Sequence, residues 1–188
     1  FGVEAELAAQ INPIFRLDMG LGYGVWQYTD DAIGTYRDGD DEVVYNYSIK
    51  DLYVGDMPQV NFVLGLTATP IEGSKLQILH KTYMTYYSEW SPDSREYVDG
   101  QTPNRRLPWQ APDYSVLDLH GSYDLPVDFN GIKPTIYLHV FNLLDATYIQ
   151  DAEDNSKYNG WDKTSTSEDA EVFFGMPTSF NLGLSVSF

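Results

Sequence analysis

Residues 151–162 contain a run of side chains that could bind a metal ion. In Asp151-Ala-Glu-Asp-Asn-Ser-Lys-Tyr-Asn-Gly-Trp-Asp162, carboxylate and amide oxygens stand at alternate positions, as they do in a calcium-binding loop. The run lacks the glycine at position six and the bidentate glutamate at position twelve. We interpret it as a solvated acidic loop, with calcium or another divalent ion as the alternative. Asp38-Gly-Asp-Asp-Glu42 is a weaker version of the same pattern.

Four tryptophans offer a second kind of chemistry, because an indole ring can either anchor a protein at a membrane interface or stack on a ligand ring. We expect Trp26 and Trp90, which lie near strand ends, to be anchors. For Trp109 and Trp161, in the middle of long loops, both interpretations stay open. With Tyr158 and Asp154, these last two are the candidate substrate-binding residues.

Three histidines occur singly along the chain. Two of them fall on the polar side of predicted strands, yet the spacing indicates no close partner for any of the three: His80, His120 and His139. We therefore expect polar positions facing the lumen rather than metal ligands. The sequence contains no Gly-x-Ser-x-Gly, His-Glu-x-x-His or phosphate-binding loop, so it shows no enzymatic machinery and we predict that the protein is not an enzyme.

The overall composition limits the class of protein. The 188 residues carry 28 acidic and 11 basic side chains, for a net charge of −17, which argues against a nucleic-acid partner. The 15 tyrosines, 9 phenylalanines and 4 tryptophans indicate a folded protein, because disordered acidic chains are poor in aromatics. Cysteine is absent, and no apolar run reaches the ~18 residues of a membrane-spanning helix.

The last strand shows how these side chains are positioned. From Phe180 to Phe188 every second residue is large and apolar, and the residues between are small or polar. A period of two predicts a β-strand with one apolar and one polar face. A strand of an outer-membrane barrel needs this pattern, because lipid lies outside it and a polar lumen inside.

Six further segments alternate in the same way. They are residues 1–10, 14–28, 59–69, 75–90, 113–125 and 132–140. Segment 75–90 has the poorest pattern, which predicts either a bulge or apolar side chains on its polar face. The connections are short, long, short, long, short and long, and acidic residues concentrate in the long ones, 29–57, 91–112 and 142–175. We expect an extended piece at Val43–Tyr47 within the first long connection.

Several motifs resemble those of TonB-dependent receptors of the outer membrane. They are Gly2-Val-Glu-Ala-Glu6, Met57-Pro58, Tyr114-Ser-Val-Leu-Asp118, Asn142-Leu-Leu-Asp-Ala-Thr-Tyr148 and Phe174-Gly-Met-Pro-Thr178, where Thr178 and Ser179 stand in place of a common arginine. The ending Asn181-Leu-Gly-Leu-Ser-Val-Ser-Phe188 resembles the barrel-assembly signal, with Asn181, Gly183, Val186 and Phe188 at its spacing.

The resemblance implies an all-β fold, an antiparallel transmembrane β-barrel of about 22 strands with an amino-terminal plug. This chain would be the carboxy-terminal portion, about seven strands, with the plug absent. It also implies uptake of a scarce nutrient (an oligosaccharide, metal chelate or vitamin), powered through periplasmic TonB. The expected partners are the rest of the receptor, outer-membrane lipids and a surface lipoprotein, and no cofactor is expected. We expect the long loops to face outside the cell and the short turns to face the periplasm.

Two other functions stay open at this stage. One is a small structural or adhesive outer-membrane barrel. The other is a secreted, sugar-binding β-sandwich, which would bury its apolar faces against each other. The odd number of strands, together with a first strand already in phase at Phe1, leads us to expect a piece of a longer receptor.

Overall fold

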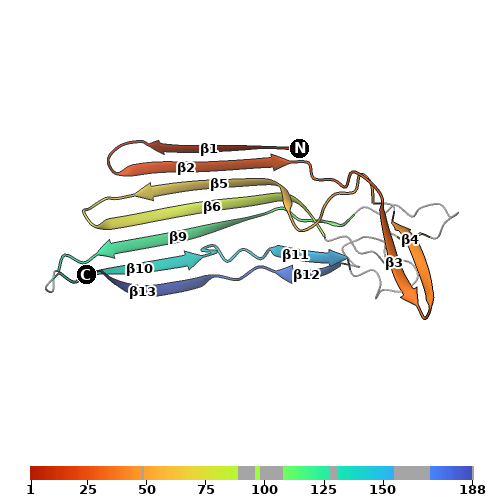
Figure 1. The fold of residues 1–188 in the computed structure, drawn as a ribbon. Coiled ribbons are helices and arrows are strands. Elements are labelled where there is room, and N and C mark those ends of the chain that lie inside the picture. The colour runs from red at the N-terminus through yellow and green to blue at the C-terminus, as the bar shows by residue number, and fades with distance from the viewer. Residues whose placement is uncertain (48, 89–95, 98–107, 128–130, 155–169, 188) are drawn as a thin grey trace.

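The protein is described by a computed structural model over residues 1–47, 49–88, 96–97, 108–127, 131–154 and 170–187. Seven long strands form one antiparallel sheet in the order β1-β2-β5-β6-β9-β10-β13 (Figure 1). Their bounds are β1 Gly2–Gln10, β2 Phe15–Gly24, β5 Pro58–Ala68, β6 Ser74–Tyr87, β9 Tyr114–Asp124, β10 Lys133–Phe141 and β13 Ser179–Ser187. These strands confirm the seven predicted segments and their order, and the described residues form an all-β structure.

Short turns gather at one end of this sheet, which we call the turn end. Figure 1 shows the long connections at the opposite end, the connection end. In the first turn, the Asn12 side-chain oxygen accepts hydrogen bonds from the backbone N–H groups of Ile14 and Phe15, both at 2.9 Å. Such a bond pattern lets an asparagine reverse the chain without a longer loop. The predicted alternation of short and long connections is therefore confirmed.

The long connections contain strands of their own. In the first, β3 (Ala32–Asp38) and β4 (Asp41–Tyr47) form a hairpin, to which β7 (Glu96–Tyr97) of the second adds a third strand. Here the prediction of a single extended piece at Val43–Tyr47 was incomplete. Gly39, with a φ of +64°, makes the reversal between β3 and β4. A glycine-containing turn between two β-prone segments favours a hairpin over an irregular loop.

The other two long connections extend existing strands. β8 (Gln110–Ala111) continues the pairing of β9 along β6, and Asp113 fills the gap by accepting a hydrogen bond from the Thr85 N–H at 2.8 Å. β11 (Ile149–Asp154) and β12 (Ala170–Phe174) pair with each other beyond β10 and β13. Residues 151–154 are thus strand, and the rest of the predicted acidic loop, 155–162, lies outside the described residues.

The register between long strands is continuous, so each strand presents one face. One row of paired residues crosses the sheet from edge to edge: Ala9, Leu17, Leu66, Ile78, Leu119, Val140 and Phe180. We call the side that this row marks the apolar face and the other the polar face. Because the register of β6 runs without a shift against both β5 and β9, the predicted bulge is wrong there. The alternative is right, since Leu79 and Tyr83 lie on the polar face.

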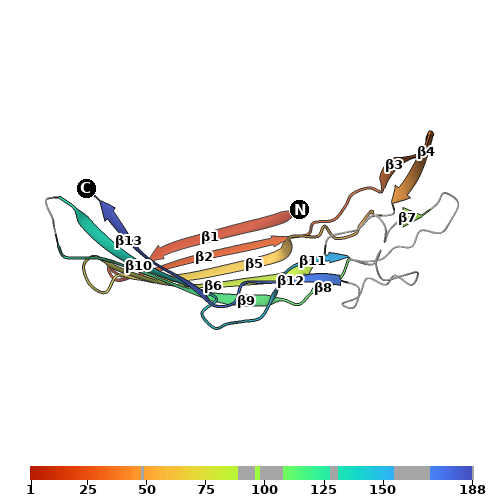
Figure 2. The same cartoon turned by 90° about the horizontal axis from the view of Figure 1, so that it is seen from below.

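The apolar face is open to its surroundings. On β13, Phe180 is 76% exposed and Leu182 66%. The sheet is curved, with β1 and β13 rising on the same side of β6 and β9 (Figure 2). A β-sandwich would need a second sheet over the apolar face, and the described residues place none there, which contradicts that alternative. Nor do they include any helix long and apolar enough to cross a membrane.

Candidate functional site

Every charged side chain of the seven long strands lies on the polar face. The register places nine of them there: Glu4, Glu6, Arg16, Asp18, Lys75, Lys81, Asp118, Asp124 and Lys133. The predicted faces are confirmed, with Phe62, Leu64, Leu119, Leu138, Leu182 and Leu184 on one side and Asp118, His139, Asn181 and Ser185 on the other. The polar face is therefore where ligand chemistry could occur.

The best-connected polar cluster lies where β10 ends. Asn142, which is 3% exposed and has a φ of +50°, donates from Nδ2 to the carbonyls of Ala146 (2.9 Å) and Met176 (3.1 Å). Its Oδ1 accepts from the Ala146 N–H at 2.9 Å. Asparagine is suited to this position because it visits the left-handed region more readily than most residues. These bonds end the pairing of β10 and turn the chain toward β11.

The carboxylate of Asp118 ties this turn to the middle of the sheet. Asp118 is only 2% exposed; its Oδ1 accepts from the Asn142 N–H at 2.9 Å and its Oδ2 lies 2.6 Å from the Lys81 Nζ. A buried carboxylate is costly unless it is paired and hydrogen-bonded, and here both oxygens have partners. On the other side of the turn, the Thr178 hydroxyl donates to the Asn142 carbonyl at 2.7 Å. The Thr178 N–H donates to the Asp145 carboxylate at 2.9 Å.

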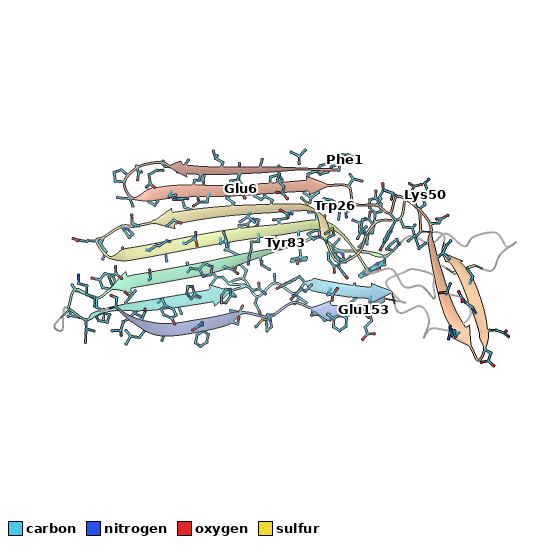
Figure 3. The ribbon with its side chains drawn as sticks, in the orientation of Figure 1. Phe1, Glu6, Trp26, Lys50, Tyr83 and Glu153 are labelled. Atoms are coloured by element: carbon cyan, nitrogen blue, oxygen red, sulfur yellow. The ribbon has the colours of Figure 1, made fainter. Side chains whose placement is uncertain are left out.

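We call Lys81, Asp118, Asn142, Asp145 and Thr178 the motif junction, because three of the quoted motifs, 114–118, 142–148 and 174–178, meet in it. Two tyrosines from these motifs pack beside it, with Tyr114 stacked on Tyr148 at 4.5 Å. Tyr83 of β6, labelled in Figure 3, is tilted against Tyr114 at 5.1 Å. A side chain at Gly175 would meet the Tyr148 ring, so a larger residue there would displace the ring from its present place. The polar groups of the junction satisfy one another, so its role is to fasten β9, β10 and the approach to β13.

A second polar cluster lies near the connection end. The Tyr86 hydroxyl donates to Asp151 at 2.8 Å and to Asp56 at 3.2 Å. Desolvation and the neighbouring Asp151 carboxylate raise the pKa of Asp56 above its usual range. Next to it, Trp109 packs against a buried cluster that includes Ala111 and Ala152. Trp109 therefore lies in a packed group of side chains, and a contact with substrate there stays a prediction.

Large side chains cover several glycines of the polar face. A Cβ at Gly183 would collide with the Tyr137 ring, and one at Gly24 would collide with the Trp26 indole. Trp26 thus lies over the polar face at the end of β2 and not on the apolar face, so the predicted membrane anchor was wrong for this residue. The Trp26 backbone N–H donates to the Gln59 Oε1 at 2.7 Å, whereas the buried Gln59 Nε2 has no hydrogen-bond partner among the described residues.

Two histidines for which the sequence indicated no partner lie next to each other in the structure. His120 and His139 lie directly opposite each other on β9 and β10, and their Nδ1 atoms are 2.9 Å apart. The expectation that no histidine has a close partner was therefore wrong for this pair. His80 lies on the apolar face, opposite Leu64 and Leu117. In the described part of the chain, no group of three or more histidine, cysteine or acidic side chains could hold a metal ion.

The other predicted site residues are scattered. Asp154 ends β11, opposite Ala170. Of the proposed assembly signal, Asn181 lies opposite His139 and Gly183 opposite Tyr137 on the polar face, and Val186 lies on the apolar face. Trp90, Tyr158, Trp161 and Phe188 lie outside the described residues. The candidate substrate-binding residues and the assembly signal both stay predictions.

The greater part of the chain is similar to a known protein family. The model of a family described as TonB dependent receptor-like, beta-barrel, matches residues 1–143. The matched part runs from β1 through β10 and stops next to Asn142 in the motif junction. No curated protein matches the chain.

Proposed function

The chain belongs to the TonB-dependent receptor β-barrel family, and from this premise we propose that its sheet is part of the wall of a transport barrel. Receptors of this family are outer-membrane transport proteins, not enzymes. The barrel takes up a scarce nutrient in a process energised by TonB. The nutrient class is an oligosaccharide, a metal chelate or a vitamin.

One observation carries this proposal: the separation of charge between the two faces. Nine charged side chains share the polar face, whereas the apolar face exposes large side chains such as Leu182 and Leu184. Exposed apolar area costs roughly 25 cal/mol per Å² in water, so a face of this extent needs an apolar environment. Lipid on the apolar face and a wet lumen on the polar face satisfy both requirements.

The sheet edges support a larger barrel. Among the described residues, β1 pairs only with β2 and β13 only with β10, so each has one free edge. Unpaired backbone groups are costly in hydrocarbon, which is why membrane sheets close. We therefore propose that further strands of the receptor pair with β1 and β13 to complete about 22 strands. A plug domain inside that barrel would contact the polar face and link the receptor to TonB.

The orientation follows from the loops. The long connections face outside the cell, and the turns, such as that at Asn12, face the periplasm. The outer loops would then carry the substrate contacts, including Trp109, Asp154, Tyr158 and Trp161, and they would contact a surface lipoprotein. Divalent ions such as calcium would offset repulsion among their acidic side chains.

Uptake by cells tests the proposal. Cells with and without the full-length gene are supplied with labelled oligosaccharides, iron chelates or vitamin B12. Uptake of one class should need both the gene and TonB, and it should stop when a protonophore collapses the proton gradient. If all three classes enter equally in cells lacking the gene, or if uptake survives loss of TonB, the transport proposal is wrong. A purely structural barrel would give the first of these results, because the gene would then make no difference to uptake.

A further inference from the structure

Two imidazole rings meet on the polar face near the centre of the sheet. His120 and His139 are cross-strand neighbours whose ring centroids lie 5.0 Å apart, with a 59° angle between the ring planes. The 2.9 Å between their Nδ1 atoms is a hydrogen-bond distance. Only one of these nitrogens can carry a proton along that line, so the other must present a lone pair.

The same spacing suits a metal ion. A histidine nitrogen lies 2.0–2.1 Å from a bound zinc ion, so two such nitrogens at a right angle stand about 2.9 Å apart. Imidazole is a preferred ligand of copper, nickel and zinc. We propose that His120 and His139 together bind one first-row divalent cation through both Nδ1 atoms. The site is new to the chain, and it does not depend on which nutrient the receptor carries.

Binding would rearrange protons without a net release. In the neutral pair, one ring carries its proton on Nδ1 and the other on Nε2. When the cation takes both Nδ1 lone pairs, the first ring moves its proton to Nε2 through water. The rings also turn slightly so that both lone pairs point to one position. Neither step requires a redox partner.

The surroundings hold the rings and leave room for the ion. Phe141 lies edge-on to His120 at 5.5 Å, and Tyr137 lies 5.4 Å from His139. An open hollow of about 440 Å³ adjoins the pair and is also lined by Lys75, Gln77 and Ser122. This volume is enough for the water molecules that would complete the coordination shell.

The nearby charges also bear on the site. Lys75 lines the same hollow as the two histidines and is the nearest positive charge given for it. Asp118 lies two residues along β9, but Lys81 and Asn142 already occupy its oxygens. With two imidazoles as the protein ligands, the metal ions should follow the general order, in which copper binds more tightly than nickel or zinc.

Copper titration of the purified full-length receptor tests the proposal, with electron paramagnetic resonance as the readout. The wild-type spectrum should show hyperfine coupling from two equivalent imidazole nitrogens. His120→Asn and His139→Asn should each remove that signal and weaken binding at this site at least tenfold. His80→Asn is the matched control, because His80 lies alone on the opposite face, and it should leave the signal unchanged.

A second measurement does not rely on the variants folding. Nickel should raise the thermal unfolding midpoint of the wild-type receptor, because a ligand that binds only the folded state stabilises it, whereas magnesium should not. A wild-type spectrum without paired nitrogens, or equal copper binding by wild type and His139→Asn, would show that the contact is only a hydrogen bond. Transport could fail or succeed independently of either result.

Discussion

The motif junction gives the sharpest prediction about stability: Asn142→Ala should weaken the receptor strongly. The substitution removes three hydrogen bonds of the side chain, to the Ala146 carbonyl, the Met176 carbonyl and the Ala146 N–H. It leaves the bond from the Asn142 N–H to Asp118 in place. It also puts an alanine at a φ of +50°, where a Cβ is strained.

The expected magnitude follows from these contacts. Three hydrogen bonds at a net ~1 kcal/mol each contribute about 3 kcal/mol. The left-handed backbone adds roughly 1–2 kcal/mol for alanine. The free energy of unfolding should therefore fall by about 4–5 kcal/mol for Asn142→Ala. For Asn142→Gly it should fall about 1 kcal/mol less, because glycine adopts this φ without strain.

Urea unfolding of the full-length receptor in lipid vesicles, followed by tryptophan fluorescence, measures these differences. Asn61→Ala is a matched control, because Asn61 lies over Gly22 on the polar face and outside the junction. It should change the free energy of unfolding by less than about 1 kcal/mol. If Asn142→Ala lowered the free energy of unfolding by less than about 1 kcal/mol, the junction would not fasten the strands as argued. The same conclusion would follow if Asn142→Gly unfolded more easily than Asn142→Ala.

Three further predictions concern faces, orientation and pH. Leu182→Arg should cost roughly 2–4 kcal/mol at the bilayer midplane and Ser185→Arg much less; equal losses of heat-resistant barrel on unheated gels would contradict the face assignment. A cysteine at Asp40 should react with an impermeant thiol reagent on whole cells and one at Asn12 should not, whereas the reverse would invert the topology. Because the pKa of Asp56 is raised in the folded state, its protonated form stabilises the fold below the ordinary pKa of 3.8, and this contribution is lost as pH rises through the higher folded value. Asp56→Asn should therefore stabilise the receptor at pH 7 and have little effect at pH 3; unfolding curves that shift equally at both pH values would rule out this origin.

The long strands could be predicted from the sequence because alternation reports faces directly. From Phe180 to Val186, each residue alternates between an apolar and a polar environment, and β13 follows that pattern. The strands of the first long connection were harder to predict, because Gly34 interrupts the alternation within β3 and Gly39 lies in the turn that follows it. Strand propensity therefore gave a signal only in β4.

The histidine pair was missed because register depends on the length of a turn. A turn over Pro126–Asn130 would place Ile136 opposite His120. In the structure, the pair nearest the turn is Asp124 and Thr135, so His139 lies opposite His120 instead. A shift of this size changes every partner across the hairpin. The motif junction was missed for a different reason, because Asp118 and Asn142 are brought together by the fold and not by their spacing. Only the resemblance of both segments to one family indicated those residues.

The row of paired residues across the apolar face also fixes how the strands slant. It begins at Ala9, one residue before the turn end of β1, and finishes at Phe180, near the connection end of β13. Each neighbouring strand is therefore displaced along its length by about one residue, roughly 3.3 Å against a strand spacing of about 4.8 Å. In the proposed closed barrel, that displacement would tilt the strands by roughly 35° from the barrel axis, within the range of membrane barrels. Further strands of the proposed barrel that join β1 or β13 would continue the same slant, so they would meet the two edges at different heights in the bilayer.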